Sequence, residues 1–184
     1  MKKLLLLLAL LSCAFAAENG SYIGVGTGYS MLKVDYPQNA KNENSDGMLG
    51  TFALGYKYNA HSRIYAEGMF RDSSNGYPTA GSVSLAYDFL VPMDKILSLY
   101  VGPVVGYTNY NSNDIAEGST NYGIEVGAVF ALNKTVELEA GYRLLKESVS
   151  NTTANTKYSA SRSQALMVQF NFYFESEKYF KYDN

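Results

Sequence analysis

The sequence predicts an all-β protein, namely an eight-stranded, antiparallel, up-and-down transmembrane β-barrel. Three observations lead to this fold class: a secretory leader, eight segments in which apolar and polar side chains alternate, and connections that alternate between short and long. In residues 81–91, for example, Val83 and Leu85 alternate with small or charged side chains. Because successive side chains of a strand point to opposite faces, such a segment separates two different environments.

The first sixteen residues have the organisation of an export signal. Two lysines at the start are followed by an apolar stretch over residues 4–11 and by the cleavage motif Ala-Phe-Ala at 14–16. The apolar stretch is far shorter than the roughly 20 residues that a membrane-spanning helix needs. We therefore expect residues 1–16 to be a cleaved signal peptide and the mature chain to begin at Ala17.

Cys13 allows an alternative form of processing. The residues before it loosely resemble a lipoprotein-processing site, in which Cys13 would become a lipidated N-terminus, but the intact Ala-Phe-Ala motif favours ordinary cleavage. Because Cys13 is the only cysteine, we expect no disulfide and no thiolate metal site in the mature chain, and no cofactor. Without the leader, Lys+Arg falls from 15 to 13 against 17 Asp+Glu, and the resulting net charge of −4 argues against nucleic acid as a partner.

Eight segments after the leader carry the alternation. They are residues 21–35, 47–58, 62–72, 80–91, 96–109, 120–132, 135–147 and 162–174. No apolar run among them is long enough for a membrane helix, so a chain that spans the membrane as sheet must close, because open strand edges leave backbone groups unpaired in hydrocarbon. We expect residues 17–174 to form the barrel and residues 175–184 a short C-terminal tail.

Each segment has one apolar face, which we assign to lipid. In chain order the apolar sets are Ile23, Val25, Tyr29 and Met31; Met48, Phe52, Leu54, Tyr56 and Tyr58; Ile64, Ala66 and Phe70; Val83, Leu85, Tyr87, Phe89 and Val91; Leu97, Leu99, Val101, Val105 and Tyr107; Tyr122, Ile124, Val126, Ala128, Phe130 and Leu132; Val136, Leu138, Ala140, Tyr142 and Leu144; Leu166, Val168, Phe170, Phe172 and Phe174. In the first set, Lys33 and Asp35 fall on the apolar parity, so we expect a bulge or an exit from the membrane there. In the fifth, Pro103 lacks a backbone N–H, which implies a bulge or weakened pairing. The seventeen tyrosines and nine phenylalanines are typical of aromatic girdles at the membrane boundaries.

The connections orient the predicted barrel. Those around 59–61, 92–95 and 133–134 are tight, whereas the remaining four are longer and rich in Asn, Ser, Asp and Gly. The longer connections are residues 36–46, 73–79, 110–119 and 148–161. Bacterial barrels have short periplasmic turns and longer extracellular loops, so we expect the four long connections to face outward from the cell.

Residues 99–107 read Leu-Tyr-Val-Gly-Pro-Val-Val-Gly-Tyr, and residues 170–174 read Phe-Asn-Phe-Tyr-Phe. With the leader and the eight segments, they resemble the small outer-membrane β-barrel family, that is, the OmpA/OmpX-like and opacity-protein-like porin group. The resemblance covers the mature chain and implies the cell outer membrane of a Gram-negative bacterium. It also implies an assembly signal, carried by Phe170, Phe172 and Phe174, for the barrel-insertion machinery. The tail departs from the family pattern and leaves Phe180 as an alternative end of that signal. No peptidoglycan-binding domain follows, so that activity of OmpA is not implied.

Charged side chains gather on the inward parity of the segments. They are Lys57, Arg63, Glu67, Arg71, Asp88, Glu125, Glu137, Glu139 and Arg143. Buried charges are stable only when paired, and an eight-stranded barrel is just wide enough to be filled by its side chains. We therefore interpret these residues as a salt-bridge network that closes the lumen. The alternative is a low-conductance, porin-like ion path through the same network.

A catalytic role is not predicted. Small barrels that modify lipid A use a histidine with a serine and an acid, but His61, the only histidine, falls in a predicted periplasmic turn. The acids of the long connections are scattered, so no metal site is predicted either. A soluble, lipocalin-like barrel would reverse the two faces, and the many charges of the inward parity argue against it.

These observations together predict a monomer with a structural or surface-interaction role. The barrel would be an inert mount, and the extracellular loops, above all 36–46 and 148–161, would carry the function. The expected partners are outer-membrane lipid and lipopolysaccharide, the barrel-insertion machinery, and a host or cell-surface ligand.

The intact mass of the protein extracted from membranes checks the processing site. We expect the mass of a chain that begins at Ala17, because the Ala-Phe-Ala motif places cleavage after residue 16. A lipidated chain that begins at Cys13, or the mass of all 184 residues, would contradict this prediction.

Overall fold

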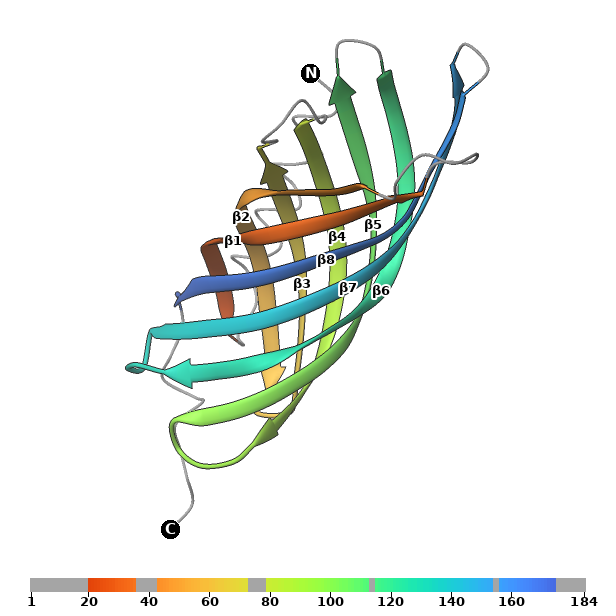
Figure 1. The fold of residues 1–184 in the computed structure, drawn as a ribbon. Coiled ribbons are helices and arrows are strands. Elements are labelled where there is room, and N and C mark those ends of the chain that lie inside the picture. Colours follow the sequence, from red (N-terminus) through yellow and green to blue (C-terminus); the bar gives the residue numbers. More distant parts are fainter. Residues whose placement is uncertain (1–19, 36–42, 73–78, 113–114, 154–155, 175–184) are drawn as a thin grey trace, which may run out of the picture.

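The computed structural model describes residues 20–35, 43–72, 79–112, 115–153 and 156–174. The strands are β1 Ser21–Asp35, β2 Glu43–Asn59, β3 Ser62–Arg71, β4 Thr79–Pro92, β5 Leu97–Ser112, β6 Ile115–Ala131, β7 Val136–Thr153 and β8 Thr156–Tyr173. Each strand pairs antiparallel with the next, and β1 closes the ring by pairing with β8 (Figure 1). The predicted eight-stranded antiparallel barrel is confirmed.

None of the described residues belongs to a helix that is long and apolar enough to cross a membrane. The processing site, the tail 175–184 and the alternative terminus Phe180 lie outside the described residues.

The two faces of the strands have opposite chemistry. Leu85 and Phe170 are 49% and 44% exposed on the outer wall, whereas Glu125 and Arg143 are 0% and 1% exposed inside. A soluble barrel would need the reverse arrangement, because its apolar side chains fill the interior and its charges face water. The apolar outer wall is therefore the surface that faces lipid.

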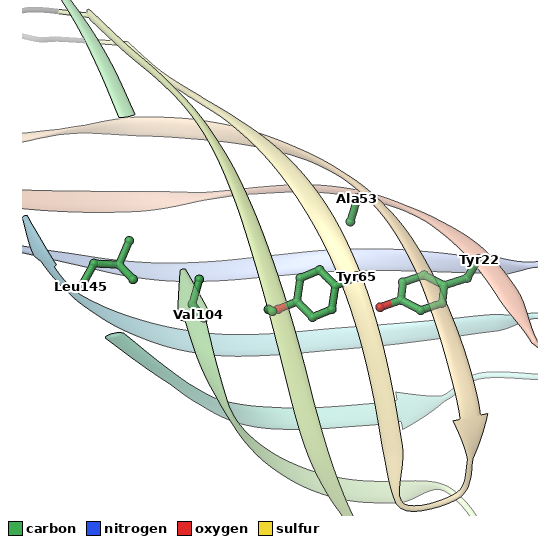
Figure 2. Packing of buried hydrophobic residues seen from close by; sticks show 6 residues of the cluster. Tyr22, Ala53, Tyr65, Val104 and Leu145 are labelled. Carbon is green, nitrogen blue, oxygen red and sulfur yellow. The ribbon is translucent and has the colours of Figure 1, made fainter. Parts of the chain in front are cut away.

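Small and aromatic side chains fill the middle of the interior. Figure 2 shows Tyr22, Ala53, Tyr65, Val104 and Leu145, all of them buried, with both tyrosine rings inside the barrel. Other tyrosines are also directed inward; these are Tyr100, Tyr110 and Tyr173. The expected aromatic girdle thus accounts for only part of the tyrosines, and the rest pack the lumen.

Several strands are longer than the sequence predicts. Parts of the expected loops 36–46, 110–119 and 148–161 are strand, because β2 begins at Glu43 and the β5–β6 and β7–β8 hairpins extend to Ser112, Ile115, Thr153 and Thr156. A strand that extends outside the membrane needs no alternation of apolar and polar residues, so the sequence pattern ends before the backbone pairing does. Residues 36–42, 73–78, 113–114 and 154–155 lie outside the described residues.

Both expected irregularities lead to identifiable local features. The register between β1 and β8 shifts between Lys33 and Val34, the place where an irregularity was expected, but the extra residue is Ser161 of β8, and β1 itself pairs with β2 without a bulge. The ladder between β4 and β5 is interrupted opposite Gly102 and Pro103 without any change of register, so the pairing is weakened but not bulged. Proline removes a ladder donor, and a Cβ at position 102 would overlap the backbone carbonyl of Tyr87 as well as the Asp88 side chain, so glycine fits there.

An Asn or Asp side chain closes each of the three tight turns, and the turns predicted around 59–61, 92–95 and 133–134 are confirmed. The Oδ1 atoms accept backbone N–H groups two and three residues ahead, as follows: Asn59 from His61 at 2.7 Å; Asp94 from Ile96 and Leu97, both at 2.7 Å; Asn133 from Thr135 at 2.8 Å and Val136 at 2.9 Å. The two donors hold the pKa of Asp94 below its ordinary value. The side chains thereby satisfy backbone donors that the tight turns leave without a strand partner.

Substitution of Asn133 by alanine tests this turn device. Asn133→Ala removes the acceptor of two backbone N–H groups, so we expect a loss of about 1 kcal/mol in the free energy of unfolding. The measurement is urea unfolding of the protein in lipid vesicles. Asn133→Asp keeps the acceptor oxygen and should remain within about 0.5 kcal/mol of the wild type. Equal stability of the alanine variant and the wild type would refute the role of this side chain.

Candidate functional site

The charged interior is the candidate site, and it depends on two strands that lie opposite each other. In a closed ring of eight strands, β3 and β7 are four strands apart in either direction. Arg63 and Glu67 lie on β3, and Glu139 and Arg143 lie on β7. Residues i and i+4 of a strand share one face, so these four residues present a cation followed by an anion on β3 and an anion followed by a cation on β7. The two strands therefore meet as two complementary pairs.

The first group of contacts is the Arg63 cluster, formed by Arg63, Asp88 and Glu139. Arg63 Nε donates to Asp88 Oδ2 of the adjacent strand β4 at 2.7 Å. Across the lumen, Nη1 and Nη2 of Arg63 donate to the two carboxylate oxygens of Glu139 at 2.8 and 2.9 Å. Asn171 Nδ2 also donates to Glu139, at 2.9 Å, and the Arg63 guanidinium lies 4.8 Å from the ring centroid of Tyr100. Each of the three nitrogens of this fully buried guanidinium thus donates to a carboxylate.

The second group is the Arg143 cluster, formed by Arg143, Glu67 and Glu125. Arg143 Nε and Nη2 donate to Glu125 Oε2 of the adjacent strand β6, at 2.9 and 2.8 Å. Nη1 reaches across the lumen to Glu67 of β3. The hydroxyl of Tyr65 donates to the other oxygen of Glu125. Each arginine thus holds one carboxylate on a neighbouring strand and one on the opposite wall.

The third group is a single ion pair near the tight turns. Lys57 Nζ is 2.7 Å from Glu137 Oε1, and Tyr173 donates its hydroxyl to Glu137 Oε2 at 2.7 Å. The Lys57 side chain is 15% exposed, against 0% and 1% for the two arginines. This pair therefore lies closer to solvent than the two arginine clusters.

At the end of the interior away from the tight turns, fewer polar side-chain atoms have a partner. Arg71 and Glu147 form no ion pair within the described residues, and Arg71 Nη2, Glu147 Oε2 and Tyr110 Oη have no hydrogen-bond partner there. These residues line a cavity of about 30 Å³ on the side of the Arg143 cluster away from the tight turns. A cavity of that size has room for one or two water molecules, which could satisfy the unpaired atoms.

The structure brings together eight of the nine predicted lumen residues in three groups, and it leaves Arg71 outside the ion pairs. The sequence reasoning missed Glu147, Asn171 and the inward tyrosines. All of them fall on the inward parity of their strands, so the alternation contained the signal: Glu147 is the last residue of the expected segment 135–147, and Asn171 and the tyrosines are uncharged polar residues.

The other predicted residues lie away from the lumen. Phe170, Phe172 and Phe174 are exposed on the outer face, and their role as an assembly signal stays a prediction. His61 is exposed in the turn between β2 and β3. In the described part of the chain, no group of three or more His, Cys, Asp or Glu side chains could hold a metal ion.

Substitution of Arg143 tests how much its cluster contributes to the stability of the barrel. Arg143→Ala leaves the buried carboxylates of Glu67 and Glu125 without their cation, so we expect a loss of about 3–5 kcal/mol in the free energy of unfolding. Urea unfolding in lipid vesicles measures it, and Lys134→Ala, in an exposed turn, is the control expected within about 0.5 kcal/mol. The triple variant Arg143→Met, Glu67→Gln and Glu125→Gln should recover most of the loss, because it removes all three charges. An Arg143→Ala protein as stable as the wild type would contradict this account.

Solved structures of other small barrels resemble the chain. Neisserial surface protein A is 16% identical, with a TM-score of 0.62 over 82% of this chain and 96% of that protein. Two proteins of Pseudomonas aeruginosa are also similar: outer membrane protein OprG, at 15% identity with a TM-score of 0.52 over 85% and 97% of the two chains, and outer membrane protein H (OprH), at 18% identity with a TM-score of 0.51 over 84% and 99%. At such low identity the likeness concerns the fold alone.

No curated protein sequence matches the chain. The sequence profile of a protein family does match, over residues 4–172, and the family is described as the outer membrane protein beta-barrel domain. This match covers more than half of the chain and agrees with the closed barrel and its apolar outer wall. The chain therefore belongs to the outer membrane protein beta-barrel family, and it is a protein of the cell outer membrane.

Proposed function

We propose that this protein is a monomeric, non-catalytic barrel with a closed lumen and a structural or surface-interaction role at the cell exterior. The observation that carries the proposal is the pair of arginine–carboxylate contacts between the opposite strands β3 and β7. Ions that pass through the lumen would have to separate these contacts or move around them. The narrowness of an eight-stranded barrel leaves little room for a second route.

The energetics of the interior favour a plug over a conducting path. Arg63, Arg143, Asp88 and Glu125 are at most 1% exposed, so their charges depend on one another for stabilisation. Breaking a buried ion pair by removing one partner costs about 3–5 kcal/mol. An opening that separated both arginine clusters at once would therefore be rare.

The surface role is supported by the length of the strands. On β7 the apolar outer positions end at Leu144, while the strand continues to Thr153. Seven residues beyond Lys146 rise about 23 Å along the strand. The β7–β8 hairpin is thus long enough to extend well past the membrane, and a rigid scaffold of this kind suits binding at the loops it holds. Lipopolysaccharide and host or cell-surface molecules are the proposed partners.

A low-conductance channel is the second candidate, and one observation favours it. The small cavity beside Arg71 and Glu147, with its unpaired polar atoms, would let water into the end of the lumen away from the tight turns. Conduction would also require a path past the Arg143 cluster, the Arg63 cluster and the Lys57–Glu137 pair. These three groups of ion pairs make conduction less favourable than a closed lumen.

Modification of lipid A is the least supported candidate. His61 lies in a tight turn, and its backbone carbonyl accepts the N–H of Leu90 at 2.8 Å. Among the described residues, no hydrogen bond or ion pair joins His61 to an acid. A general base needs an oriented partner and a substrate within reach, and the turn offers neither.

Recordings in planar lipid bilayers test the closed lumen. We expect no steady single-channel steps from the wild type, and steps from the double variant Arg63→Ala and Arg143→Ala, because it removes both cations that join the opposite walls. Heat-modifiable migration in detergent gels checks that the double variant has folded. Lys95→Ala together with Lys134→Ala removes the same charge from two exposed turns and should stay silent. Steady wild-type steps that disappear in Arg143→Ala or Glu67→Ala would favour the channel instead.

A further inference from the structure

Two cations face each other on the outer wall of the barrel. Lys146 of β7 and Arg162 of β8 are register partners, and both side chains are exposed. Side chains directly opposite on neighbouring antiparallel strands have Cβ atoms about 4.5–5.5 Å apart, and like charges in such a pair destabilise the sheet. Within the described residues neither side chain makes an ion pair, and Glu147, the acidic neighbour of Lys146, is buried in the lumen. Among the described residues, therefore, no anion stabilises the pair.

The pair lies at one edge of the apolar wall. Val136 pairs with Phe172 at the end of the strands near the tight turns, and Lys146 pairs with Arg162 ten residues further along both strands. Ten residues rise about 33 Å, and with a tilt of about 40° they cover about 25 Å, which is the height of the apolar band of such barrels. The outward residues next to the two cations on the membrane side are apolar, namely Ile124, Leu144 and Leu166. Lys146 and Arg162 are thus placed at the level of the lipid headgroups of the leaflet opposite the tight turns.

A groove lies beside this pair. The pairing between β6 and β7 ends at Asn121 and Glu147; beyond it, β6 pairs only with β5, and β7 only with β8. The ends of the β5–β6 and β7–β8 hairpins are apart in Figure 1. The groove has a volume of about 640 Å³, and its lining includes Tyr122, Ile124, Leu144, Lys146 and Arg162. The groove therefore combines an apolar wall on the membrane side, an aromatic ring, and two cations at the end away from the tight turns.

We propose that this groove binds a phosphate-bearing lipid of the outer leaflet, with the phosphate on Lys146 and Arg162 and an acyl chain along Ile124 and Leu144. Arginine and lysine bind phosphate through charge-assisted hydrogen bonds, which would offset the repulsion between the two cations. The long side chains can lie along apolar surface while their charges reach the headgroup level. A soluble anion would leave the apolar wall of the groove unused. The inference rests on the proposed function only for the orientation of the barrel, with the tight turns toward the periplasm.

The test measures binding of diphosphorylated lipid A to the full mature protein in a neutral detergent, by native mass spectrometry across a lipid titration. We expect Lys146→Ala together with Arg162→Ala to weaken binding at least tenfold, because both cations that contact the phosphate are lost. Lys146→Arg, which keeps the charge, should bind within about twofold of the wild type, as expected for a surface substitution that changes little energy. Higher salt should weaken wild-type binding, since the contact is exposed and ionic.

Matched controls separate the possible sources of binding. Lys95→Ala together with Lys134→Ala removes the same charge at the other end of the barrel and should leave binding unchanged. Heat-modifiable migration confirms that each variant is folded. Equal binding by the Lys146 and Arg162 double variant, equal binding of the same lipid after dephosphorylation, or equally tight binding of inorganic phosphate would each overturn the proposal. A wild type that conducts ions yet loses lipid A in the double variant would refute the closed lumen and leave this site standing.

Discussion

The contacts of two arginines across the lumen are the interaction on which the rest of this barrel depends. Arg63 extends from β3 to Glu139 of β7, and Arg143 extends from β7 back to Glu67 of β3. Backbone pairing joins only neighbouring strands, so these side chains supply the ties between opposite walls. Their burial makes the arrangement demanding, because removal of any one partner leaves an uncompensated charge in an apolar-walled cylinder.

Closure of the sheet and the direction of its faces could be read from the sequence, because lipid and lumen impose opposite requirements on alternate residues. Contacts between neighbours such as Arg63 and Asp88 follow once the register of one hairpin is known. The contact of Arg63 with Glu139 depends on the stagger of all eight strands around the ring, which no local pattern encodes. The sequence therefore predicted which residues enter the lumen, but not which of them meet across it.

The two main differences from the sequence expectation have physical causes. Strands continue into Asn- and Ser-rich stretches because an antiparallel hairpin outside the membrane needs no apolar face. Tyrosines enter the lumen because inward glycines leave space for them: the Tyr22 ring occupies the space beside Gly55, and the Tyr100 ring lies against Gly127 and Gly141. Composition alone assigned these rings to the membrane boundary, whereas large and small residues from different strands complement each other inside.

The ladder between β4 and β5, which joins one half of the ring (β1 to β4) to the other (β5 to β8), is interrupted at the two register positions opposite Gly102 and Pro103. The other seam between the halves, β1 against β8, pairs along its length with one register shift, between Lys33 and Val34. Arg63 and Arg143 each bind one carboxylate in each half of the ring. The side-chain contacts thus cross the interior between the two halves of the ring, and the amide hydrogens beside the interruption between β4 and β5 are ones that solvent would reach early when that seam opens locally.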